Sequence, residues 1–241
     1  MRDLLRNDYA ISGGEQMSRD ELHSGLLLAS TSMPPSSPEG GTSAGRWEGQ
    51  VASASISGVL DLGSADLREL PPFVRESASL DSLKRLSLSG NELSELSLQA
   101  GRLGRLQQLS LFNNKLTKLP PELANLGSLT SLYLDYNQLA ELPDGLCELT
   151  ELRKLGLYHN RVASISEKIG SLTRLNTLAL QHNRVVALPA AFAELSALTD
   201  LSLSHNKLAD AGAIASLSSL RQLGLSHNKL RALPDLDALH D

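Results

Sequence analysis

Seven asparagines recur at an almost constant interval in this chain of 241 residues. Five of the steps between them are 23 residues long and one is 22, and the positions are Asn91, Asn114, Asn137, Asn160, Asn183, Asn206 and Asn228. Around each asparagine the chain repeats the template L-x-x-L-x-L-x-x-N-x-L, as in the stretch from Leu106 to Leu116. A fixed period of this length is the signature of a solenoid, in which each unit stacks on the unit before it.

The two closely spaced leucines of each unit predict a short strand. Because side chains alternate along a strand, Leu109 and Leu111 point inward while the residues beside them point to the opposite face. Successive strands then pair in parallel, and parallel strands need a returning segment, here carrying leucines such as Leu119, Leu123 and Leu126. We therefore expect an α/β repeat solenoid with a parallel concave sheet of about eight short strands.

The repeated asparagine lies where the chain leaves each strand. A short amide there can satisfy backbone groups of the turn that would otherwise be buried without a partner. Stacking of the units predicts that the seven asparagines form a structural ladder along the rod.

Two regions of different composition divide the chain. The Ser/Pro/Gly-rich composition around residues 29–45 predicts that residues 1–52 are a disordered or weakly helical N-terminal arm. Residues 53–241 form the repeat domain, with about seven full repeats preceded by an atypical one at Val59–Leu62, where Ala65 stands in place of the asparagine. At the C-terminal end no polar cap follows the last repeat, so we expect an uncapped end.

Composition excludes several classes of protein. A net charge of −5 and a pI near 5.7 argue against nucleic acid as the main partner, since that needs a strongly basic face. No apolar run is long enough to insert into a membrane. The single cysteine, Cys147, excludes an intramolecular disulfide, and we expect a cytoplasmic protein in which Cys147 is a small buried apolar residue.

The segment Leu119-Pro-Pro-Glu-Leu-Ala-Asn-Leu-Gly-Ser-Leu129 and its successors resemble the intracellular leucine-rich-repeat family, and within it the Ras-group repeats of 23 residues. The resemblance covers about residues 56 to 241 and implies a horseshoe fold with a scaffolding or docking role in signalling. The unit at Ala209-Asp-Ala-Gly-Ala-Ile214 departs from this form, because it lacks the proline and is one residue shorter. It is more similar to the 22-residue repeats of phosphatase-regulatory proteins.

The outward positions of the strands differ from unit to unit, so specificity for a partner is expected there. Four of the eight aromatic residues fall on outward positions of three consecutive units, and they are Phe112, Tyr133, Tyr136 and Tyr158. Aromatic side chains are common binding hot spots, because they supply large contact area at a small entropic cost. Flanked by Asp135 and Lys154, they predict a protein-binding site on the concave face. The alternative is that these rings only cover one another on the sheet.

A second pattern is a tripeptide of histidine, asparagine and a cation in four consecutive units. The pairs that flank the asparagine are His159 and Arg161, His182 and Arg184, His205 and Lys207, and His227 and Lys229. Stacking places them along one edge, and we call these eight residues the basic rim. The rim suits an acidic segment of a protein partner, although a solvated turn position that tolerates histidine is an alternative. Metal is not expected, because imidazoles arranged in parallel do not converge on one point.

No phosphate-binding loop, nucleophile elbow or paired metal motif occurs, so we expect neither catalysis nor a cofactor. The sequence favours a non-catalytic protein-protein interaction module or signalling scaffold. Two alternatives stay open. The chain could be the substrate-recognition part of a larger kinase, phosphatase or ubiquitin-ligase complex, or a structural assembly element.

Overall fold

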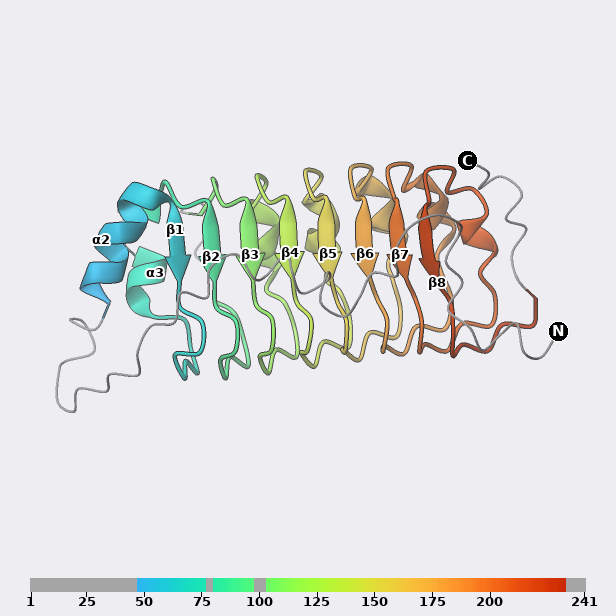
Figure 1. The fold of residues 1–241 in the computed structure, drawn as a ribbon, viewed down its shortest axis with the longest axis horizontal. Coiled ribbons are helices and arrows are strands. Elements are labelled where there is room, and N and C mark those ends of the chain that lie inside the picture. Colours follow the sequence, from blue (N-terminus) through green and yellow to red (C-terminus); the bar gives the residue numbers. More distant parts are fainter. Residues whose placement is uncertain (1–46, 77–79, 98–102, 233–241) are drawn as a thin grey trace.

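The computed structural model describes residues 47–76, 80–97 and 103–232, and within them eight strands form one parallel sheet. The strands follow one another in chain order from β1 to β8, so each repeat pairs only with its neighbours, as Figure 1 shows. Their bounds are β1 Val59–Asp61, β2 Arg85–Ser87, β3 Gln108–Ser110, β4 Ser131–Tyr133, β5 Lys154–Gly156, β6 Thr177–Ala179, β7 Asp200–Ser202 and β8 Gln222–Gly224. This arrangement confirms the predicted repeat solenoid with eight short parallel strands.

Leucines of equivalent register form the core. The central leucine of each strand pairs with the central leucine of the next, as Leu109 does with Leu132 and Leu132 with Leu155. Leu109 and Leu111 are fully buried, as are the convex-side residues Leu123 and Phe192. No single repeat could bury these side chains alone, so the stacking of neighbours provides the apolar burial that stabilises the fold.

The returning segments of the central and C-terminal repeats form short 3₁₀-helices on the convex side. Their bounds are η3 Pro121–Asn125, η4 Asp144–Glu148, η5 Glu167–Ser171, η6 Ala190–Glu194 and η7 Gly212–Ile214. Prolines at positions 120, 143 and 189 come directly before η3, η4 and η6, each with extended backbone. Each of these helices has three to five residues, which is the usual length of a 3₁₀-helix.

The N-terminal end of the sheet is covered by helix α2 (Glu48–Ser57), and a second short helix, α3 (Pro72–Glu76), lies beside it (Figure 1). Helix α2 begins inside the range 1–52 that we had assigned to the N-terminal arm. Ala54 is fully buried and the Trp47 ring packs 6.3 Å from the ring of Phe73, so this helix is part of the repeat domain. The rest of the predicted arm, residues 1–46, and the C-terminal residues 233–241 lie outside the described residues.

The seven repeated asparagines lie one above another and tie each repeat to the preceding one. Asn137 is representative: its side-chain oxygen accepts a 3.0 Å hydrogen bond from the Leu116 N–H, and its amide nitrogen donates to the carbonyls of Leu111 and Leu134. Six of the seven are at most 8% exposed, while Asn228 in the last described repeat is half-buried. The ladder satisfies buried backbone groups of two adjacent repeats at once, which holds the repeats in register.

Candidate interaction surfaces

One turn position, directly before the ladder asparagine, adopts the left-handed backbone conformation in seven consecutive repeats. Gly90 is the first, with φ of 68°, and the other six have φ angles between 53° and 58°, at Asn113, Tyr136, His159, His182, His205 and His227. Residues other than glycine rarely adopt this conformation. Its regular recurrence gives these side chains the same direction in every repeat.

The rings at this position stack on one another. Tyr136 stacks on His159 with ring centroids 4.9 Å apart, and the three following imidazole pairs are separated by 4.8, 4.1 and 4.0 Å. Every one of the four interplanar angles is 15° or less. We call the five residues Tyr136, His159, His182, His205 and His227 the ring stack. The four histidines of the basic rim therefore form a continuous column of rings, with Tyr136 at its N-terminal end.

A second group of rings lies next to the start of this stack. Phe112 and Tyr158 both pack edge-to-face against Tyr136, at centroid distances of 5.4 and 4.9 Å. We call Phe112, Tyr136 and Tyr158 the ring cluster. Tyr136 belongs to both groups, so the predicted aromatic site and the histidine rim form one continuous surface.

The fourth predicted aromatic residue stands apart from this cluster. Among the described residues, the Tyr133 ring contacts no other ring, although the side chain is half-buried. Burial raises the pKa of its phenol, and the nearby Asp135 carboxylate adds to the shift. Tyr133 therefore lies on the same face as the ring cluster without being packed into it.

Asp135 has a structural contact of its own within the predicted site. Its Oδ1 atom accepts a 2.8 Å hydrogen bond from the Tyr158 N–H in the next repeat. An ideal Cβ placed on Gly156 would lie 2.3 Å from Asp135 Oδ2, so the carboxylate occupies the space beside this glycine. The small residue at position 156 therefore leaves no room for a partner's side chain, because Asp135 fills the space. The other flanking residue, Lys154, is exposed and makes no described ion pair.

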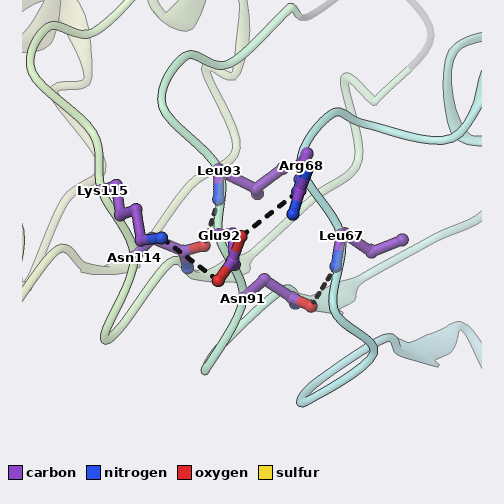
Figure 2. A network of polar contacts seen from close by, with 7 residues as sticks. All are labelled: Leu67, Arg68, Asn91, Glu92, Leu93, Asn114 and Lys115. Carbon is purple, nitrogen blue, oxygen red and sulfur yellow. Dashed lines mark hydrogen bonds and ion pairs between the residues drawn. The ribbon is translucent and has the colours of Figure 1, made fainter.

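The position after the ladder asparagine is charged in every repeat except that of Gln138, and the pairing of these charges differs along the molecule. In the N-terminal repeats Glu92 lies between Arg68 and Lys115, with ion pairs of 3.3 and 3.1 Å (Figure 2). The hydrogen bond and the charge of Lys115, assisted by Arg68, lower the pKa of Glu92. Further along the same column stand four cations, Arg161, Arg184, Lys207 and Lys229. All four are exposed, and none forms an ion pair with another described residue.

The sequence pattern of histidine, asparagine and cation does not include Tyr136, although its side chain belongs to the same column. The signal was present, because Tyr136 precedes Asn137 just as His159 precedes Asn160. What the spacing could not supply was the left-handed turn, which directs both side chains the same way.

Residues capable of chemistry do not cluster elsewhere in the described part of the chain. There, no group of three or more His, Cys, Asp or Glu side chains is arranged to hold a metal ion. The Cys147 thiol is only 5% exposed, and burial raises its pKa to about 11. Within the same residues, no helix has both the length and the apolar character needed to span a bilayer.

The stacked parallel strands, the asparagine ladder and the variable outward residues together define a leucine-rich-repeat domain. Family models agree: a model described as "Leucine rich repeat" matches residues 81–139 and 104–162, and one described as "Leucine-rich repeat region" matches residues 144–241. The chain belongs to the leucine-rich-repeat family.

Solved structures share the fold. An internalin from Listeria monocytogenes has a TM-score of 0.56 and 27% identity, over 68% of this chain and 55% of that one. A leucine-rich-repeat protein of Leptospira interrogans has a TM-score of 0.50 and 27% identity, over 76% and 59% of the two chains. The leucine-rich-repeat ectodomain of a plant membrane receptor kinase from Arabidopsis thaliana was solved in complex with Casparian strip integrity factor 2. It has a TM-score of 0.58 and 31% identity, over 71% of this chain and 24% of that one.

The chain thus spans less than two thirds of each of these proteins. A search among curated proteins returned no significant match.

Proposed function

We propose that this protein is a non-catalytic binding module that docks a protein partner on its concave face, at the ring cluster and the adjacent Tyr133. The observation that carries the proposal is the edge-to-face contact of Tyr136 with both Phe112 and Tyr158. Aromatic side chains held rigidly in this way lose little conformational entropy when a partner covers them. A signalling scaffold in the cytoplasm is the role that we expect for such a module.

Burial supports the proposal. Phe112, Tyr136 and Tyr158 are each half-buried, so their rings pack on the protein and still present part of their surface to solvent. Leucines supply the core of this fold, and the outward aromatic residues are not needed to fill it. If these three rings only covered one another, they would not need to stay accessible to solvent.

Polar groups at the edge of the cluster add selectivity. The Asp135 carboxylate lies between the Phe112 and Tyr158 positions of the neighbouring strands, and Lys154 stands exposed at the start of β5. A partner that packs on the rings therefore also meets one negative and one positive side chain. Such charges at the periphery of an interface fix orientation and association rate more than affinity.

The test is affinity capture followed by mass spectrometry with the wild-type protein and a triple variant, Phe112→Ala, Tyr133→Ala and Tyr158→Ala. We expect the proteins retained by the wild type to be lost from the variant, because the variant lacks most of the ring surface. Circular dichroism checks that the variant is folded.

A matched control removes apolar surface elsewhere. Ile56 and Val186 are the large apolar residues that are exposed in the described part of the chain, at 90% and 54%. The variant Ile56→Ala with Val186→Ala is expected to retain the partners. If the folded triple variant captures the same proteins as the wild type, the concave-face proposal is wrong.

Two further functions are distinguishable in the same experiment. Co-purification of a kinase, phosphatase or ubiquitin-ligase subunit would indicate the substrate-recognition part of a larger enzyme. A molecular mass that rises with protein concentration, measured by light scattering, would indicate an assembly element.

A further inference from the structure

We propose that the basic rim, which adjoins the ring cluster, is a second binding site and that it receives an extended acidic segment of a protein partner. The cations that would hold this segment are Arg161, Arg184, Lys207 and Lys229. The proposal stands without the concave-face site, because it concerns different side chains and a different chemistry.

The cations of the rim differ from Lys115, which has the same place in an earlier repeat. Where Lys115 occupies this column, Glu92 neutralises it, as Figure 2 shows. In the four later repeats the column holds only exposed cations, which make no described ion pair. The described loops after these cations contain one acidic residue, Asp210, and its carboxylate already accepts the N–H of Gly212. A protein of net charge −5 thus keeps four like charges in a row without a counter-charge among its described residues.

The ring stack limits the kinds of ligand that the rim can bind. Each imidazole between Tyr136 and His227 has a ring against both of its faces, at 4.0–4.9 Å. The faces are therefore not available to stack on nucleic acid bases, which is how proteins commonly hold single strands. The cations beside the stack carry guanidinium and ammonium groups, whose N–H donors suit the carboxylates of Asp and Glu.

The spacing of the rim histidines favours a partner segment with an extended backbone. The three His–His steps advance by 4.0–4.8 Å each, and the asparagine ladder holds the backbone of every turn in the same register. An extended chain rises ~3.3 Å per residue, so about five residues span the four repeats. One charge per repeat then faces the segment along its whole length.

The test uses a fluorescein-labelled peptide of twelve glutamates and a neutral peptide of alternating Ser and Gly, with binding followed by fluorescence anisotropy at low salt. We expect the wild type to bind the acidic peptide and not the neutral one. Binding is expected to weaken steeply when NaCl is raised, because exposed charges are screened by salt. The double variant Arg184→Gln and Lys207→Gln is expected to lose affinity by about tenfold.

The matched control is the double variant Lys115→Gln and Lys118→Gln, which removes the same charge from the repeat of Asn114 and is expected to bind as the wild type does. Equal losses in the two variants would mean a general charge effect and would overturn the proposal, as would failure of the wild type to bind. The concave-face variant Phe112→Ala with Tyr133→Ala, which leaves Tyr158 in contact with His159 and His182, is expected to bind the acidic peptide normally. The two sites can therefore fail independently.

Discussion

The Asp135 carboxylate lies over Gly156 of the next repeat while it accepts a hydrogen bond of 2.8 Å from the Tyr158 N–H. Glycine is required at position 156 because a Cβ there would come within 2.3 Å of Asp135 Oδ2. The backbone conformation does not impose this requirement, since Gly156 is an ordinary strand residue. An acid and a glycine that are 21 positions apart in the sequence therefore form one structural unit at the centre of the proposed binding face.

We expect Gly156→Ala to lower the free energy of unfolding by about 1–3 kcal/mol, because the new methyl group displaces the carboxylate and breaks its hydrogen bond. In an Asp135→Ala background the same substitution should cost far less. Chemical denaturation of the four proteins measures this coupling. Gly127→Ala is the control, since no atom lies within 4 Å of the Cβ that it would add. Equal costs of Gly156→Ala in both backgrounds would show that the two residues are independent.

Asn137→Ala should destabilise the protein by about 3 kcal/mol. The Leu116 N–H and the Leu111 carbonyl would lose their side-chain partner, and each unsatisfied buried group costs about 1–3 kcal/mol. Asn228→Ala should cost less, because the last ladder residue is half-buried and water can replace the amide. Urea denaturation compares them, and a smaller effect at Asn137 than at Asn228 would contradict this account of the ladder.

His205→Asn should reduce stability by about 1–2 kcal/mol through the loss of two ring contacts, at 4.1 and 4.0 Å. Asparagine keeps the left-handed turn, as Asn113 does at the same position with φ of 53°. His205→Val should be worse, because a branched side chain is strained at positive φ. Thermal unfolding ranks the three proteins, and an unchanged midpoint for His205→Asn would show that the stacking does not stabilise the fold.

The Cys147 thiol should titrate only at high pH and make stability fall there. Burial raises its pKa in the folded protein to about 11, whereas an unfolded thiol titrates near 8.5. The unfolded chain therefore loses its proton first, so the stabilising contribution is complete below about pH 8.5 and is lost as the pH rises toward 11.

We accordingly expect the wild type to lose more stability than Cys147→Ala between pH 8 and pH 11. Unfolding by urea at several pH values measures this difference. The variant keeps every lysine and tyrosine of the wild type, so these residues contribute the same pH dependence of stability to both proteins. Rapid reaction of the native thiol with Ellman's reagent at pH 8 would be inconsistent with a buried, high-pKa group.

The fold was predictable because contacts in a solenoid join residues that are one period apart. Leu109 and Leu132 have the same place in successive repeats, so their spacing of 23 residues already implied that they are neighbours. Helix α2 was placed less well. Its sequence contains several serines and its burial depends on Trp47 and Ala54, which have no counterparts in the repeat pattern.

The amino-acid sequence by itself determined the stacking of repeats, the leucine core and the asparagine ladder. These properties follow from the period of the repeat and the spacing of its leucines. Only the tertiary structure decided that Tyr136 heads the ring stack, that Asp135 fills the space beside Gly156 and that the rim cations have no described counter-charge. The physical reason is that these features depend on the sign of φ at a turn and on the direction that each side chain takes between repeats, and the spacing of residues specifies neither.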